Sequence, residues 1–490
     1  MPPTVQAETT VKRTSRPKML WDLSSLAVGQ LLSVLLGFAG FAYLARTLSP
    51  ASYGILEYAV GLAGLAAIVI EGGVGSVGTL HVSRDRGRAP ELAASVPAAR
   101  LLLALLVIPL VGLSSLVSGF DRTVTTLIWF FAISLLAIPL KQDWLLQGLD
   151  RMTLVAPAQV LKSGAFALGV VLVVRGDDGI LRIGLVEVAA AFISAAYLVG
   201  AQRAVALPVR LDMRLSRART LLRAGASIGA SNMLWPFMTY APILLVTNLA
   251  GSAEAAWLGA AHRIVVALVS FSALYFFNLY PLFGRGLRED REQWGRLISS
   301  SFRLIAWASI GFALATSLLA GTIVSAVFGA PFVAAGPVLA IAIWILPLRL
   351  LSGHARWTLL AAERQGVLLV AEIACAACIV ILSLVLIPRY GASGGALAGV
   401  LGNVFGWTLA HVLAQRCVGA LPGVRQLLLP SSGALLAGVL AWSIGGHALM
   451  TLALAMGTYA VYMGVTAADL FGDAVRLAHA KKEVMSTGGS

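Results

Sequence analysis

Charged residues are scarce in this chain. Asp, Glu, Lys and Arg make up 12% of the 490 residues, about half of the roughly 25% that is typical of soluble domains. The chain is long enough for several soluble domains, yet no polar segment of domain length interrupts its apolar stretches. The composition therefore excludes a protein built from ordinary soluble domains.

Cysteines are few, and common catalytic motifs are missing. The three cysteines form no disulfide framework, and Cys375 and Cys378 have CxxC spacing inside an apolar run, where packing explains them better than metal or redox chemistry. The chain has no GxxxxGK[ST] loop and no HExxH motif. ATP hydrolysis and HExxH zinc chemistry are therefore not encoded, and we expect no catalytic residues, no metal and no cofactor.

Long apolar stretches are abundant instead. A helix needs about 20 apolar residues to cross about 30 Å of hydrocarbon, and such stretches recur about fourteen times. We therefore expect an all-α polytopic membrane protein. The predicted spans are 20–45, 54–79, 97–118, 123–146, 153–174, 181–202, 225–249, 255–280, 302–327, 334–358, 366–387, 393–415, 430–446 and 449–470.

The breaks between these stretches alternate between arginine-rich and arginine-poor. The rich breaks include 84–88, 203–223 and 285–296. Because cytoplasmic loops retain Lys and Arg, this alternation places the even-numbered loops and both termini in the cytoplasm. It also explains the net charge of +14 without a nucleic-acid partner. The arginines expected at the outer side are Arg46, Arg122, Arg175, Arg182 and Arg389.

The organisation along the chain suggests two halves. LLQGLDRMTLVA at 145–156 is similar to LLAAERQGVLLVA at 359–371, as expected for a parallel six-plus-six repeat with a site between the halves. The two halves are joined by a basic segment, 203–224. We expect it either to lie on the inner leaflet or to be an ordinary charged cytoplasmic loop. The apolar run after the basic N-terminus is too long for a signal peptide, so we expect it to remain as the first span. The predicted divisions are an N-terminal cytoplasmic tail (1–19), an N-lobe (20–202), a basic linker (203–224), a C-lobe (225–415), two further spans (416–470) and a C-terminal cytoplasmic tail (471–490).

Several ionisable residues fall inside the apolar stretches. Glu57 and Glu71 share one helical face with Gly61 and Gly64, because their spacings follow the period of a helix. Intramembrane charges are costly and normally face a bundle interior or a wet cavity. The cations and the histidine found at such depth are Lys162, His262, Arg263 and Arg349.

Two interpretations of these residues remain open. In the first, a glutamate neutralises Lys162 or Arg263 and holds helices together. In the second, the cations form a cavity for an anionic group, and a carboxylate regulates it or carries a coupling ion, H+ or Na+. Arginine suits phosphate because its planar fork can contact two oxygens.

Specific segments resemble the bacterial polysaccharide-biosynthesis, or oligosaccharide flippase, family. LARTLSPASYGILEYAVGLAGLAAIVIEGGVGS at 44–76 resembles its first helical hairpin, with Ser49 in place of the usual glycine. The segments 249–283 and 387–399 resemble its seventh-to-eighth helix region and the break before its twelfth helix. Arg46 and Arg263 stand at positions where the resembling segments of that family carry an arginine. The hairpin positions that match are Ala45, Arg46, Leu48, Pro50, Tyr53 and Gly54.

The resemblance implies the fold of the multidrug and oligosaccharidyl-lipid exporter superfamily: two six-helix lobes in a V with a central cavity, plus two C-terminal helices. It implies a flippase in the cytoplasmic (inner) membrane that moves a polyprenyl-(di)phosphate-linked oligosaccharide outward, with polysaccharide polymerase and glycosyltransferases as partners. The residues expected to bind substrate are Arg46, Lys162, Arg263 and Arg349; those expected to line the cavity or couple an ion are Glu57, Glu71 and His262.

Two alternatives stay open at this point. A multidrug or cation antiporter of the same superfamily would need an acidic or aromatic cavity, which Glu57 and Glu71 could supply. An integral-membrane transferase or polymerase acting on lipid-linked sugars would need large outer loops, and the loops expected here are short.

Overall fold

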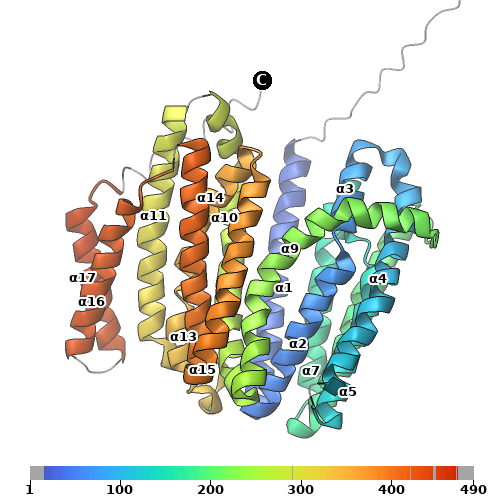
Figure 1. Cartoon of the computed structure of the whole chain (residues 1–490), viewed down its shortest axis with the longest axis horizontal. Helices are drawn as coiled ribbons and strands as arrows, with labels where there is room; N and C mark the ends of the chain where they lie inside the picture. The colour runs from blue at the N-terminus through green and yellow to red at the C-terminus, as the bar shows by residue number, and fades with distance from the viewer. Residues whose placement is uncertain are drawn as a thin grey trace, which may run out of the picture.

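The computed structural model describes residues 16–117, 119–289, 291–419, 421–444, 448–470 and 472. Almost all of this part of the chain is helical (Figure 1). The predicted tails 1–19 and 471–490 fall almost wholly outside the described residues.

The helices form two lobes and a C-terminal pair, as the sequence predicts (Figure 1). The N-lobe contains α1 (Arg16–Thr47), α2 (Pro50–Glu71), α3 (Val74–Arg84), α4 (Ala89–Val117), α5 (Arg122–Ser134), α6 (Asp143–Gly148), α7 (Ala156–Val173) and α8 (Ile180–Ala204). The C-lobe contains α9 (Leu215–Ala250), α10 (Ser252–Glu289), α11 (Arg291–Leu318), α12 (Ala320–Phe328), α13 (Ala335–Ala342), α14 (Ile345–Ala361) and α15 (Gln365–Val418). The C-terminal pair is α16 (Leu428–Ile444) and α17 (Ala448–Thr466).

The predicted number of spans is confirmed. Within the described residues, thirteen helical segments are long and apolar enough to cross a bilayer. One of them, α15, holds two spans because Gly391 has non-helical dihedrals (φ 54°, ψ −132°) just after Pro388. Glu254 accepts the backbone N–H of Ala392 at 2.7 Å, so it satisfies a donor at this break. The protein is therefore a multi-pass membrane protein, with about fourteen spans in the described part of the chain.

The fourth span of each lobe is interrupted. In the N-lobe, α5 passes into a 3-10 segment, Leu135–Leu140, which contains Pro139. In the C-lobe, α13 and α14 are separated by Ile343 and Trp344. Interrupted helices at corresponding positions of two halves are typical of transporters built from repeats, and they often line the substrate site.

Local sequence explains where α2 begins and ends. Ser49 is its N-cap and its hydroxyl accepts the Ser52 N–H, while Pro50 occupies the first turn, where no N–H is needed. Gly72 ends the helix in the left-handed conformation (φ 56°). A two-glycine break, Gly72–Gly73, then separates α2 from α3.

The two lobes meet along a glycine-lined face of α2. Gly54 lies against the backbone of Ser252 at the start of α10, and Gly64 lies under the ring of Tyr240 on α9, where a Cβ would be 2.8 Å from Cε2. Small residues let helix backbones approach closely in membranes. We call this contact of α2 with α9 and α10 the lobe seam.

The linker between the lobes differs from its predicted extent. Only residues 205–214 are non-helical, and α9 already begins at Leu215. Figure 1 shows the first turns of α9 crossing one end of the N-lobe before the helix bends into the bundle. Asp212 donates its N–H to Ala94 (3.0 Å), and Arg217 lies 3.4 Å from Glu91, so this segment is fixed to the N-lobe.

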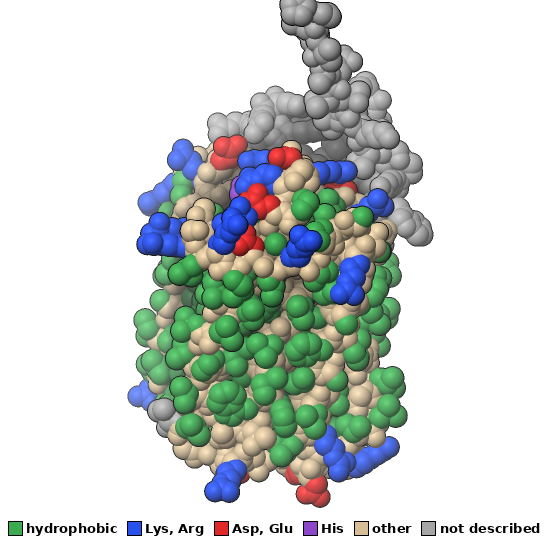
Figure 2. Space-filling view, turned by 90° about the vertical axis from the view of Figure 1, so that its right-hand side faces the viewer, with side chains coloured by type: hydrophobic (Ala, Val, Ile, Leu, Met, Phe, Trp, Pro, Cys, Tyr) green, Lys and Arg blue, Asp and Glu red, His purple; other side chains and the backbone are tan. Residues whose placement is uncertain are grey.

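The surface has the pattern expected of a membrane protein. Figure 2 shows a belt of hydrophobic side chains between two rims that carry Lys and Arg. One rim holds the loops around Arg84–Arg88 and Arg203–Arg214, and we call it the basic end of the bundle; the rim near Arg46 and Arg122 is the opposite end.

The close contact at Gly54 predicts that a single added methyl group lowers the thermal stability of the protein. In Gly54→Ala the new Cβ would overlap the carbonyl oxygen of Ser252, so α2 and α10 must separate. Overpacking typically costs about 1–3 kcal/mol. We expect the purified variant to aggregate at a temperature several degrees lower than the wild type. The matched control is Gly176→Ala, since nothing lies within 4 Å of a Cβ there. If both variants aggregate at the same temperature, the close contact at Gly54 does not stabilise the protein.

Candidate functional site

Three cavities follow one another across the lobe seam. The N-lobe cavity, of about 330 Å³, lies among α1, α2, α5, α7 and α8. The central cavity, of about 210 Å³, lies among α1, α2, α9 and α10. The C-lobe cavity, of about 500 Å³, lies among α9, α10, α14 and α15. Tyr240 and Arg263 line both the N-lobe and central cavities, and Val266 and Ser270 line both the central and C-lobe cavities.

The N-lobe cavity gathers cations. Lys141, Lys162 and Arg263 all line it, together with Glu187. Lys162 Nζ lies 2.9 Å from Glu187 Oε1, so α7 and α8 are joined by this ion pair. Lys141 follows directly after the 3-10 segment that interrupts the fourth span. It has no ion-pair partner in the described part of the chain, so its charge is the one left for a ligand.

A two-pronged ion pair crosses from one lobe to the other. Arg263 Nε donates to Glu57 Oε1 at 2.8 Å and Arg263 Nη2 donates to Glu57 Oε2 at 3.1 Å. Glu57 is 1% exposed. Gly259 makes room for it, because a Cβ there would lie 2.6 Å from Glu57 Cγ. On its other side, the Arg263 guanidinium stacks on the Phe41 ring at 3.3 Å. The pair therefore joins α2 of the N-lobe to α10 of the C-lobe within the lobe seam.

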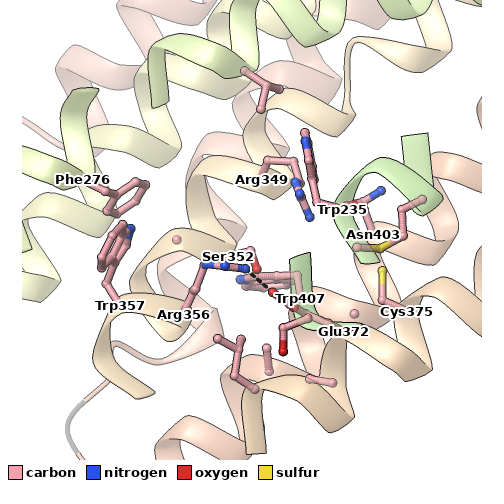
Figure 3. Close-up of a pocket in the computed structure, with 18 of the residues that line it drawn as sticks. Trp235, Phe276, Arg349, Ser352, Arg356, Trp357, Glu372, Cys375, Asn403 and Trp407 are labelled. Atoms are coloured by element: carbon pink, nitrogen blue, oxygen red, sulfur yellow. Dashed lines mark hydrogen bonds and ion pairs between the residues drawn. The ribbon is translucent and has the colours of Figure 1, made fainter. Parts of the chain in front are cut away.

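The C-lobe cavity combines aromatic rings with charged groups (Figure 3). Arg349 stacks on Trp235, with its Cζ 3.4 Å from the ring centre. Arg356 forms an ion pair with Glu372. These contacts link α14 to α9 and to α15 around the cavity.

The predicted site residues separate into two groups. Lys162 and Arg263, from opposite lobes, line the same cavity. Glu57 and His262 line the central cavity, and Arg349 lines the C-lobe cavity. All five therefore lie on the series of cavities that crosses the seam.

The remaining two predicted residues lie elsewhere. Glu71 pairs with Arg100 of α4 at the basic end, and Arg100 also donates to the carbonyl of Lys141 at 2.7 Å. Arg46 donates to the carbonyls of Ala326 and Val327 (2.8 Å to the latter) at the end of α12. Cations stabilise the carboxyl end of a helix, where carbonyls lack partners. Arg46 thus fastens the two lobes together at the opposite end.

Sequence reasoning missed Lys141 and Glu187 as site residues. Both fall inside predicted spans, 123–146 and 181–202, so the rule that intramembrane charges face a cavity could have found them. Lys141 was overlooked because it lies near the end of its span, where a cation normally reaches the interface. The 3-10 segment before it directs it into the cavity instead.

In the regions that the structure describes, no three His, Cys, Asp or Glu side chains gather in a way that could hold a metal ion.

Comparisons with known proteins agree with this fold. A family model described as polysaccharide biosynthesis protein matches residues 20–287. A solved structure described as lipid II flippase MurJ, inward closed conformation, is 13% identical with a TM-score of 0.70, covering 91% of this chain and 99% of that one. An inward-facing multidrug resistance MATE family transporter of the MOP superfamily is 15% identical with a TM-score of 0.59, covering 81% and 98%. No curated protein matches the sequence. The fold is therefore that of this group of membrane transporters.

The Glu57–Arg263 pair predicts a coupled effect of two substitutions. Arg263→Ala leaves a buried carboxylate without its partner, which typically costs about 3–5 kcal/mol. We expect a sharp fall in the amount of folded protein in the membrane, and recovery when Glu57→Gln is added. Quantitative blotting and size-exclusion chromatography would measure both. If Arg263→Ala alone is as abundant as the wild type, the pair does not hold the lobes together.

Proposed function

Since this chain belongs to the polysaccharide biosynthesis protein family, we propose that it is a flippase for a polyprenyl-(di)phosphate-linked oligosaccharide. It moves the saccharide head from the inner to the outer leaflet by alternating access between its lobes. The single observation that supports this most directly is the convergence of Lys141, Lys162 and Arg263 on one cavity at the lobe seam.

The cavities meet the physical requirements of such a substrate. A polar head linked to phosphate cannot cross hydrocarbon unaided, whereas a polyprenyl tail can stay in the lipid. The head needs an enclosed polar path with cations for the phosphate, and it needs no catalytic nucleophile. Glu57 and Glu187 each neutralise one of the three cations, so an arriving phosphate meets one uncompensated charge, on Lys141.

The contacts at the opposite end suggest how access alternates. Gly54 lies against Ser252, and Arg46 is bound to the end of α12, so the lobes are closed together there. In the proposed cycle the head enters from the basic end, and these contacts separate to release it. A ligand drives such a change only through its different affinity for the two states. An H+ or Na+ gradient, or consumption of the exported saccharide, would supply the energy.

The arrangement of carboxylates disfavours a cation antiporter that works through an acidic cavity, because such a cavity needs free carboxylates. Glu57, Glu187 and Glu372 line the three cavities, and each is paired with a cation. The uncompensated charge in the N-lobe cavity is positive, which suits an anionic substrate.

We also propose that the basic end faces the cytoplasm and that the protein lies in the cytoplasmic (inner) membrane with both termini inside. The positive-inside rule supports this orientation.

Cysteine labelling checks the orientation. In a background without Cys375, Cys378 and Cys417, single cysteines replace Arg86 at the basic end and Arg122 at the opposite end. Both positions are exposed. In intact cells we expect an impermeant maleimide to label position 122 alone, and to label position 86 only after permeabilisation. The reverse pattern would invert the proposed topology.

Deletion of the gene in its own cell tests the transport activity. We expect lipid-linked saccharide to accumulate in a form that an impermeant oxidant of sugar diols cannot reach, while surface polysaccharide is lost. When Lys141→Gln is expressed in the deletion strain, we expect export to be about tenfold slower than with the wild type. The reason is that one charge-assisted contact is worth about 1.5–3 kcal/mol.

The matched control is Arg389→Gln, which removes an exposed cation at the opposite end and should restore export fully. Accumulated saccharide that the oxidant reaches from outside would place the defect after transport and contradict the proposal.

A further inference from the structure

The C-lobe cavity is rich in aromatic side chains. Three of the eleven tryptophans of the chain line it, together with one phenylalanine. Phe276 packs against the backbone of Gly353, which has no side chain to prevent that contact. Figure 3 shows rings on several sides of the cavity. The aromatic residues are Trp235, Phe276, Trp357 and Trp407.

Uncommitted hydrogen-bonding groups lie between these rings. Asn403 Nδ2 donates to the carbonyl of Gly399 at 2.8 Å, which leaves its amide oxygen available. Asn232 and Ser352 line the cavity, and within the described residues neither side chain has a hydrogen-bond partner. Trp407 is 7% exposed, and its indole N–H is buried without an acceptor among the described residues. Because a buried polar group normally has a partner, the Trp407 indole N–H is suited to a ligand. The Asn232 side chain is exposed and the Ser352 side chain is half-buried, so both are accessible to a ligand from the cavity wall.

The charges of this cavity are arranged differently from those of the N-lobe cavity. Arg356 is neutralised by Glu372. Arg349 has no ion-pair partner among the described residues, and its guanidinium carbon lies 3.4 Å from the centre of the Trp235 ring. The cavity therefore offers flat faces and forked donors rather than a group of unpaired cations.

This combination is the chemistry that recognises a sugar ring. A pyranose has an apolar C–H face, which packs on an aromatic ring, and a rim of hydroxyls, which bond to amides, carboxylates and guanidinium groups. The volume of about 500 Å³ lies within the roughly 300–1,000 Å³ that is usual for ligand sites. An N-acyl or free hydroxyl group of a saccharide would satisfy the donors and acceptors left open here.

We propose that the C-lobe cavity is the saccharide subsite, while the N-lobe cavity holds the phosphate. This inference rests on the proposed function and divides the head group between the lobes. The central cavity connects the two subsites, since it shares Arg263 with the first and Val266 with the second. A substrate bound in this way contacts both lobes across the seam.

Binding measurements on the purified full-length protein separate the two subsites. One probe is the lipid-linked saccharide isolated from the deletion strain, and the other is undecaprenyl diphosphate without sugar. The C-lobe variants are Asn232→Leu and Trp235→Leu, and the N-lobe variant is Lys141→Gln. The matched control is Asn248→Leu, an exposed asparagine on the same helix as Asn232 but outside the three cavities.

We expect the wild type to bind the saccharide-linked lipid at least about tenfold more tightly than the sugar-free lipid, as one good aromatic contact and a hydrogen bond allow. Asn232→Leu and Trp235→Leu should bring the Kd values of the two lipids close together by weakening only the saccharide-linked lipid. An unchanged Kd for the sugar-free lipid also shows that these variants are folded. Lys141→Gln should weaken both lipids by the same factor. Asn248→Leu should change neither Kd.

Two results would overturn the subsite and leave the proposed function standing: equal affinity of the wild type for both lipids, or a ratio that survives in both C-lobe variants. Failure of the wild type to bind either lipid would overturn the flippase proposal and the subsite with it. If Trp235→Leu loses affinity for both lipids, Asn232→Leu alone decides, because its side chain has no partner in the described residues to lose.

Discussion

The structure depends on pairing the carboxylates that line its cavities with cations. The Glu57–Arg263 pair shows this constraint most clearly, because it is buried, two-pronged and shared between the lobes. An ion in such a place is tolerated only with a well-placed partner. Gly259 supplies the space for the carboxylate, and Phe41 covers the guanidinium. The pair therefore sets how closely the two lobes can approach.

The glycine face of α2 and this ion pair support each other. Gly54 and Gly64 let α9 and α10 lie close to α2, which brings Glu57 within reach of Arg263. Small residues at the seam let the two lobes pack closely, and in the proposed cycle this same face closes and separates. That is the property that two lobes need if they alternate access to a shared cavity.

The cavities across the seam have different chemistry. The N-lobe cavity concentrates positive charge behind the interrupted fourth span, while the C-lobe cavity has tryptophan faces and amides. In the proposed cycle, phosphate and saccharide are held by different lobes, so one head group bridges the moving parts. The carboxylates on this path, Glu57, Glu187 and Glu372, are each paired with a cation, which is the charge arrangement that the proposed anionic substrate requires.

The sequence by itself determined the number of spans, the alternation of basic breaks and the shared face of Glu57, Gly61 and Gly64, because a helix has a fixed period and a bilayer a fixed thickness. It also indicated that Lys162, Arg263 and Arg349 were costly charges, although it missed Lys141 and Glu187. Only the tertiary structure decided that Glu57 pairs with Arg263 while Glu71 pairs with a neighbour at the basic end. Periodicity places a side chain on a face of its own helix, but which helix lies opposite that face depends on how all the spans pack together.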